Sequence, residues 1–251
     1  MIRASCKLVQ IQILGSPERR LFQTFAPGVA YVAAEDQEGD KSIGTCFHIG
    51  ESIFITARHV VENRKITKIA TTVPSLNISF GSYVPSEARQ IEGPYFHPKP
   101  EYDLAALRIV GLHAPQIPFL PVDESHPHEE LMLKTVVVMG FPPIPGSISP
   151  VLLCTKAEVN ASIVTYWDNQ RVLVVSCLGR GGFSGGPALT TPRHCLGVVT
   201  RSLVNAPMPA ELGFMVVVGP WPILELLDYN HIMPRYLRDE MWNERQKVKG
   251  A

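Results

Sequence analysis

The chain has 251 residues, which is enough for one large or two small domains with a sizeable hydrophobic core. Its formal net charge is +0, with 23 basic and 23 acidic side chains, and this balance argues against a nucleic acid or another polyanion as a partner. The 22 prolines and 19 glycines predict many turns and few long helices, so an all-β or mixed architecture is favoured over a helical bundle.

The five cysteines, at positions 6, 46, 154, 177 and 195, form no C-x-x-C pair and are odd in number. They predict neither a disulfide framework nor a zinc site, and they fit a reducing compartment. No stretch approaches the roughly 18 apolar residues of a membrane span. The N-terminal residues lack the apolar segment of a secretory signal. We therefore expect a cytoplasmic protein without a membrane partner.

The first half of the chain predicts short strands. Residues 1–24 form an N-terminal extension, and residues 25–120 form a first β-barrel. A turn at 50–51 joins two strands into a hairpin, and the second strand leads directly into His59. The strands expected in this half are 29–34, 42–49, 52–56, 65–72, 77–83 and 104–109, with a loop at 93–100.

Asp103 immediately precedes the apolar strand 104–109. An acid in this position either caps a turn or is held at the edge of the core to orient another group. Taken alone, Asp103 is better explained as an ordinary loop aspartate, and a lone histidine such as His59 is more often structural than catalytic. Neither residue indicates a function without partners elsewhere in the chain.

The middle of the chain reads as a linker over residues 115–125. Residues 126–130, HPHEE, superficially resemble metal ligands. Pro127 and the lack of a third histidine in strand or helix register favour a polar loop instead. The sequence therefore predicts no metal and no cofactor.

Residues 121–220 predict a second β-barrel, and residues 221–251 predict C-terminal helices and a tail. Pro222 opens a short helix, and Pro234 starts a second, charged helix. The strands expected in this half are 135–142, 151–159, 162–167, 171–177, 195–200 and 213–218. The fold class is therefore all-β, with two six-stranded antiparallel β-barrels and short C-terminal helices.

Residues 179–187, GRGGFSGGP, hold five glycines around Ser184. Glycine lets backbone N–H groups face a ligand, and a serine among them can attack a carbonyl and bind the resulting oxyanion. A flexible turn and a phosphate-binding loop are alternatives, although the Lys-Ser/Thr pair of a phosphate loop is absent. The nucleophile elbow of α/β-hydrolases is disfavoured, because the Gly-Gly-Pro that follows is a poor helix start.

His59, Asp103 and Ser184 occur in the order His, Asp, Ser, the first two in the first group of strands and the third in the second. With TARH at 56–59, DLA at 103–105 and GFSGGP at 182–187, the chain resembles the trypsin/chymotrypsin-like serine peptidases over about residues 25–230. The likeness is greatest to the intracellular, HtrA-like branch, because Cys46 has no cysteine partner beside His59. No PDZ module is expected after the closing helix.

The resemblance implies a serine endopeptidase that cleaves a peptide or protein substrate. In that family pattern His59 is the general base, Asp103 orients it, and Ser184 is the nucleophile of an acyl-enzyme mechanism. The N–H groups of Gly182 and Ser184 would form the oxyanion hole. Thr200 matches a position whose hydroxyl supports the aspartate, although a plain strand threonine is nearly as good an explanation.

Two departures from the family pattern concern activation and specificity. Phe183 replaces the acid that pairs with a new N-terminus in digestive relatives, so that switch cannot operate. Leu178 replaces the aspartate of trypsin-type pockets, which disfavours Lys or Arg at P1 and favours a small or apolar residue. An inward-pointing Arg201 would favour an acid instead. The residues expected to bind substrate are Leu178, Thr200, Arg201, Ser202 and Gly213.

Two further hypotheses stay open at the level of sequence. The fold could be a catalytically silent interaction module, although the intact His, Asp and Ser argue against it. Alternatively, a regulatory protein partner could dock on the C-terminal helix through Leu237, Met241 and Trp242. Packing of that helical face onto the protein's own barrels is the favoured alternative to docking.

Overall fold

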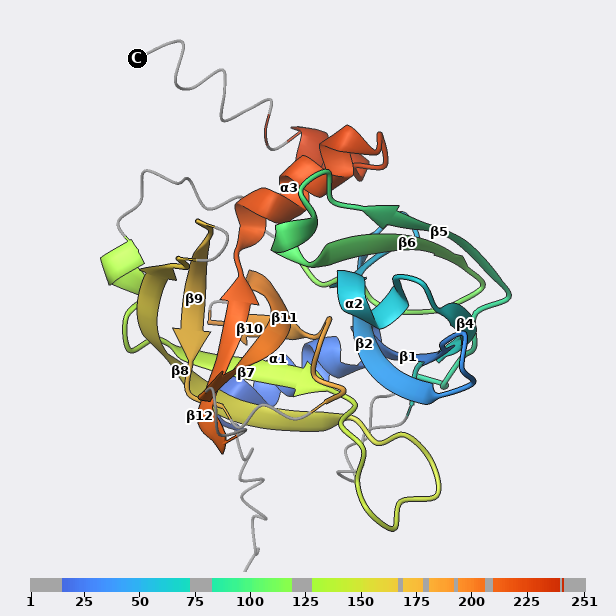
Figure 1. Ribbon diagram of the computed structural model, residues 1–251, viewed down its shortest axis with the longest axis horizontal. Coiled ribbons are helices and arrows are strands. Elements are labelled where there is room, and N and C mark those ends of the chain that lie inside the picture. The colour runs from blue at the N-terminus through green and yellow to red at the C-terminus, as the bar shows by residue number, and fades with distance from the viewer. Residues whose placement is uncertain are drawn as a thin grey trace, which may run out of the picture.

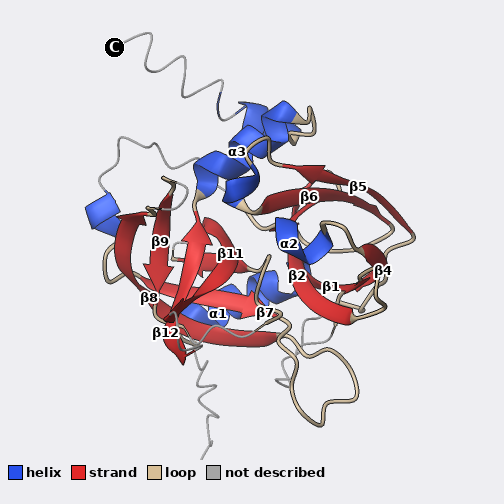
Figure 2. Ribbon diagram, in the orientation of Figure 1, coloured by secondary structure: helices blue, strands red, loops and turns tan. Residues whose placement is uncertain are grey.

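The strands fall into two antiparallel groups that follow one another along the chain (Figure 1, Figure 2). The computed structural model describes residues 15–72, 83–118, 128–166, 169–177, 181–191, 194–205, 210–239 and 241. Each group has six strands, and one group closes into a barrel while the other is a half-barrel. The predicted all-β fold with two six-stranded units is confirmed.

The half-barrel has the strand order β4-β1-β2-β3-β6-β5. Its edges approach each other, because the Ala88 N–H donates to the Ile69 carbonyl at 2.9 Å. Strand β3 lies between β2 and β6, and all of its residues are buried. The strands are β1 (Val29–Glu35), β2 (Lys41–Gly50), β3 (Ile53–Ala57), β4 (Lys65–Ala70), β5 (Gln90–Phe96) and β6 (Leu104–Val110).

The second group is a closed barrel in the order β10-β11-β12-β9-β8-β7. Its interior is lined with Val, Leu and Met side chains that alternate with outward-facing residues along the strands. The strands are β7 (Thr135–Gly140), β8 (Leu153–Val164), β9 (Arg171–Val175), β10 (Pro187–Thr190), β11 (His194–Asn205) and β12 (Ala210–Val218).

Short helices connect and flank the strands. They are α1 (Pro17–Phe25), α2 (Arg58–Val61) and α3 (Pro220–Tyr229), with 3₁₀ turns η1 (Ala26–Gly28), η2 (Pro100–Tyr102) and η3 (His128–Leu131). Residues 235–239 and 241 are also helical. Within the described ranges, none of the helices has the length and apolar character needed to cross a bilayer.

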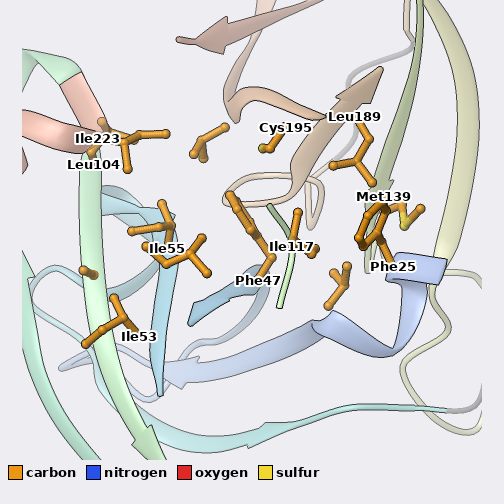
Figure 3. Close-up of a cluster of buried hydrophobic side chains, with 14 of the residues drawn as sticks. Phe25, Phe47, Ile53, Ile55, Leu104, Ile117, Met139, Leu189, Cys195 and Ile223 are labelled. Carbon is orange, nitrogen blue, oxygen red and sulfur yellow. The ribbon is translucent and has the colours of Figure 1, made fainter. Parts of the chain in front are cut away.

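One hydrophobic core joins both β-units (Figure 3). Phe47 and Leu104 enter it from the half-barrel, and Met139 and Leu189 enter it from the closed barrel. Helix α3 adds Ile223, which lies beside Leu104 in Figure 3. Because the same cluster draws on both units, burial of apolar surface holds them in one arrangement.

Helix α1 was not predicted and belongs to this shared core. The Ser16 hydroxyl caps it by accepting the Arg19 N–H at 3.2 Å, and Pro17 occupies the first turn. Its apolar face, Leu21, Phe22 and Phe25, is buried. The helix therefore contributes packing to both units, although its sequence lies in the segment treated as an extension.

Several strand boundaries differ from the prediction. Residues 93–96, expected to be loop, continue strand β5, and the separate strands expected at 151–159 and 162–167 form the single strand β8. Strand β10 follows the serine loop directly and was not expected. The strand expected at 77–83 lies outside the described residues except for Tyr83, as does most of the expected linker.

Candidate active site

His59 lies on α2, immediately after strand β3 ends at Ala57. Its Nδ1 is 2.7 Å from Oδ2 of Asp103, and its backbone N–H donates to Oδ1 of the same carboxylate at 2.9 Å. The neighbouring Arg58 N–H donates to the Asp103 carbonyl at 2.9 Å. Three bonds from one aspartate therefore fix both the backbone and the ring of His59.

Asp103 lies between turn η2 and strand β6 and has a left-handed backbone conformation with φ 53°. Asp is among the few residues that tolerate this conformation, and the Asp103 N–H closes the turn on the Pro100 carbonyl at 3.0 Å. An ionised carboxylate only accepts hydrogen bonds, so the facing Nδ1 of His59 carries the proton. The other ring nitrogen, Nε2, is then left as an acceptor, as a general base requires.

Ser184 is half-buried in the loop before strand β10. Its hydroxyl donates to the Thr200 carbonyl on β11 at 3.3 Å, and its own carbonyl accepts the Thr45 N–H from the half-barrel at 2.9 Å. Hydrogen bonds thus bring His59 and Asp103 together. In the described part of the chain, the bond made by the Ser184 hydroxyl goes to Thr200 rather than to the His59 ring.

The serine loop packs against the half-barrel so closely that it requires glycine. A Cβ on Gly185 would lie 2.0 Å from the Thr45 carbonyl oxygen and 2.4 Å from Thr56 Oγ1, and the residue has φ 84°. Such a conformation and such an approach exclude a side chain. The glycines around Ser184 therefore place this serine directly on the unit that carries His59.

Gly182 has φ 96°, and its carbonyl accepts two hydrogen bonds. The donors are the Thr45 hydroxyl at 2.6 Å and the Phe141 N–H at 3.2 Å. Within the described ranges, neither the Gly182 N–H nor the Ser184 N–H donates to a backbone carbonyl.

Phe183, the residue before the serine, is an apolar anchor. It is buried in the core of the closed barrel, next to Gly140, where a Cβ would meet the Phe183 Cα at 2.8 Å. Because the Phe183 side chain is apolar, it has no charge that could pair with an amino terminus.

Four of the five residues predicted to bind substrate lie on β11 and β12. Thr200 is buried, and its Oγ1 has no hydrogen-bond partner in the described part of the structure. Arg201 and Ser202 are half-buried, and no atom lies within 4 Å of the position that a Cβ on Gly213 would occupy. Leu178 lies outside the described residues.

Two contacts of the site were missed by sequence reasoning. Thr45 connects strand β2 to the serine loop, and Glu225 on α3 reaches the segment before Asp103, where it lies 3.3 Å from Lys99 Nζ. A threonine inside the apolar strand 42–49 was the available signal for Thr45. No local pattern marks Glu225, because its partner is far away in the chain.

The proposed docking face on the C-terminal helix is largely taken up by the protein's own core. Leu237 is buried in the shared core, and Met241 packs against it. Trp242 lies outside the described residues. Leu237 and Met241 therefore pack onto the protein's own core, as the alternative to docking proposed.

Comparison with family models identifies a trypsin-like peptidase domain over residues 44–198. No curated protein matches the chain. A similar solved structure is the active form of the Rv3671c protease from M. tuberculosis, with 20% identity, a TM-score of 0.58 and coverage of 83% of this chain and 82% of that chain.

Two further structures share the fold. The HtrA-type protease AlgW with a tripeptide has 16% identity and a TM-score of 0.60, over 84% of this chain and 62% of that one. A serine endoprotease from Yersinia pestis has 20% identity and a TM-score of 0.57, over 92% and 68%. At these identities the likeness concerns the fold.

Proposed function

Because the chain belongs to the trypsin-like peptidase family and is a serine endopeptidase, we propose that His59, Asp103 and Ser184 are its catalytic triad. The observation that carries the proposal is the double contact of Asp103 with His59, through Nδ1 at 2.7 Å and the backbone N–H at 2.9 Å. This arrangement selects the tautomer that leaves Nε2 free to accept a proton.

In the proposed reaction, the Ser184 hydroxyl leaves the Thr200 carbonyl and turns to Nε2 of His59 when substrate binds. Such bonds often tighten only in the substrate complex. The Ser184 oxygen attacks the scissile carbonyl while its proton passes to Nε2. The amine then leaves with that proton, and water hydrolyses the acyl-enzyme by the same route.

The N–H groups of Gly182 and Ser184 are the proposed oxyanion donors. Each such donor contributes about 3 kcal/mol to stabilisation of the transition state. Support comes from the two amides themselves, because neither donates to a backbone carbonyl in the described ranges. They can therefore bind the oxyanion without breaking an internal bond.

The substrate is proposed to be a peptide or protein with a small or apolar P1 residue. Thr200, Ser202 and Gly213 are uncharged, and the space beside Gly213 is open. Arg201 is the only basic residue in the proposed set, and a P1 acid is the alternative that its side chain would favour. A P1 series of peptide substrates separates the two cases.

Regulation by a docked protein partner, rather than by zymogen cleavage, is the proposed form of control. The support is Phe183, which is buried where digestive relatives need an acid. A cytoplasmic location is part of the same proposal. The buried free thiols of Cys46 and Cys195 suit a reducing compartment.

The direct test is intact-mass analysis after exposure to a fluorophosphonate, with Ser184→Ala and His59→Ala as controls. One adduct that is lost in both variants is the expected result, because labelling needs both the hydroxyl and its base. If folded wild-type protein gains no adduct, the catalytic proposal fails. The protein would then be a binding module on a peptidase fold.

A further inference from the structure

Thr45 is buried completely, and its hydrogen bonds include three to the serine-bearing unit and one to strand β3 of its own unit. Its hydroxyl donates to the Gly182 carbonyl at 2.6 Å and accepts the Phe141 N–H at 3.1 Å. Its backbone N–H donates to the Ser184 carbonyl at 2.9 Å, and its carbonyl accepts the Thr56 hydroxyl at 2.7 Å. One residue of the half-barrel thus holds both proposed oxyanion residues of the other unit.

We infer that Thr45 is a positioning residue of the active site, whose hydroxyl holds the carbonyl of the Gly182–Phe183 peptide and so restrains, from one side, the glycine whose N–H in the preceding peptide is a proposed oxyanion donor. The inference rests on the proposed function of Ser184 and its neighbours. It adds a residue that touches neither substrate nor the reacting atoms.

The need for such a residue follows from the backbone at Gly182. A glycine with φ 96° has no side chain to restrict rotation of the peptides on either side of it. The Thr45 hydroxyl and the Phe141 N–H clamp its carbonyl from two directions. Without the hydroxyl, the Gly182 carbonyl keeps only the longer bond from the Phe141 N–H, so the loop is held less firmly and the fraction of molecules with a formed oxyanion hole falls.

Thr45 also connects the oxyanion loop to the strand that carries the base. Its carbonyl is bound by Thr56, which lies three residues before His59 on the same strand-to-helix segment. Gly185 packs against both threonines. Thr45 therefore connects the loop of the oxyanion donors, through its hydroxyl, to the segment of the histidine, through its carbonyl, although these groups belong to different β-units.

Loss of the hydroxyl should leave the fold intact. The Phe141 N–H already lies 3.2 Å from the Gly182 carbonyl, so these two groups satisfy each other when the Thr45 oxygen is removed.

Thr45→Ser and Thr45→Ala both lack the threonine methyl, and they differ from each other by the hydroxyl oxygen alone. The comparison of these two variants isolates that oxygen.

The first measurement is kcat and KM on a peptide substrate. Thr45→Ala should lower kcat by about 10- to 100-fold with KM changed less than about threefold, because the donor geometry serves the transition state rather than substrate binding. Thr45→Ser should restore kcat to within about threefold of wild type. Thr190→Ala is the matched control, since this buried threonine donates to the Thr135 carbonyl at 3.2 Å, away from the serine loop. It should leave kcat unchanged.

The second measurement does not depend on activity. In protein labelled with ¹⁵N-glycine, Thr45→Ala should shift the Gly182 amide resonance and speed its hydrogen exchange, while Thr45→Ser and Thr190→Ala should leave both close to wild type. An unchanged Gly182 amide in Thr45→Ala, or equal kcat values for the Ala and Ser variants, overturns the inference. If Thr45→Ala shows the amide effect but wild type gains no fluorophosphonate adduct, the proposed function fails while the role of Thr45 in placing the loop stands.

Discussion

Asp103 holds His59 through both of its carboxylate oxygens, and it does so from a left-handed backbone conformation with φ 53°. Asn is the closest substitute, because it tolerates that conformation and its amide oxygen can still accept the His59 backbone N–H. Its NH₂ group would face Nδ1, however, and a donor there requires the opposite tautomer of the ring. Replacing Asp103 by Asn therefore changes the group that faces His59 Nδ1 while it keeps the backbone conformation of residue 103.

We predict that Asp103→Asn lowers kcat by about 10⁴-fold while the fold is kept. The reason is that Nε2 would carry the proton and could not accept one from Ser184. Steady-state kinetics on a peptide substrate measures the loss, and circular dichroism checks the fold. A variant with nearly full activity would show that Asp103 does not orient the base.

A second prediction at this scale compares two glycines with similar backbone conformations. Gly185→Ala should destabilise the protein by about 3 kcal/mol or more, because its Cβ meets the Thr45 carbonyl oxygen at 2.0 Å. Gly146→Ala should cost only about 1 kcal/mol, because φ is 81° and no atom lies within 4 Å of its Cβ. Urea unfolding gives both values, and equal losses would mean that contact with Thr45 does not matter.

The sequence motifs predicted the positions of His59, Asp103 and Ser184 relative to the strands. Each lies where its motif placed it, at the end of a strand, before a strand and in a glycine-rich loop. Thr45 could not be found in this way, because its hydroxyl bonds to a residue 137 positions away. A hydrogen bond between distant residues leaves no local pattern.

At the scale of elements, alternation of apolar and polar residues predicted most strands, and failures occurred where another signal competed. Gly93 and Pro94 suggested a loop in a segment that remains strand β5, where the pairing with β6 shifts register. The bend in β8 at a register shift between Val159 and Ala161 made one strand look like two. Helix α1 was not predicted, although Ser16 and Pro17 are helix start signals, because residues 1–24 were expected to form an N-terminal extension.

Helix α1 should be essential for stability. Phe25→Ala should lower the free energy of unfolding by about 3 kcal/mol, because Phe25 is buried in the core shared by both β-units. Gln23→Ala, on the exposed face of the same helix, should change it by less than about 0.5 kcal/mol. Chemical denaturation measures the difference. If both variants unfold alike, the helix does not support the core.

Helix α3 contacts the segment that leads to Asp103, and this contact should make stability depend on pH. Burial lowers the pKa of His97, whose Nε2 lies 3.5 Å from Glu225, with Lys99 and Glu101 nearby. The unfolded chain therefore binds a proton more readily than the folded one. Burial lowers the pKa of His48 in the same way.

Because folding lowers the pKa of His97, the neutral side chain makes its full contribution to the free energy of unfolding above the unfolded pKa of about 6.5. That contribution is lost as pH falls through the folded pKa. We predict that the free energy of unfolding decreases from pH 7 toward pH 5, and that His97→Gln makes this decrease shallower. Urea titrations at several pH values measure it. An identical slope in the variant would assign the pH dependence to other groups.

At the scale of the whole molecule, the two-unit architecture followed from the number and grouping of strands, whereas the shared core did not. The alternation of apolar and polar residues along a strand predicts which side chains face inward. It does not predict whether they enter the core of one β-unit or the core that both units share. Ile223 and Leu237, far along the chain, join Phe25 and Phe47 in one cluster. Only the assembled fold shows that both ends of the described chain pack between the β-units.

Burial also protects cysteine thiols, because Cys195 lies in the shared core and Cys46 lies in the separate core of the half-barrel. Burial raises the pKa of Cys195 to about 12 and raises that of Cys46 as well, so neither is a thiolate near neutral pH. We predict that a disulfide reagent at pH 8 modifies these two cysteines only when the protein unfolds. Peptide mapping of native and urea-treated samples tests this, and rapid native modification of either residue would contradict it.

The placement of His59 and Asp103 in the half-barrel and of Ser184 in the closed barrel makes the protein a natural candidate for a two-part sensor. A fragment ending at residue 118 carries the proposed base and its orienting acid, and a fragment beginning at residue 128 carries the proposed nucleophile. Each fragment leaves its half of the shared apolar cluster exposed. If each fragment is fused to one member of a binding pair, proteolysis becomes a readout of whether that pair has met.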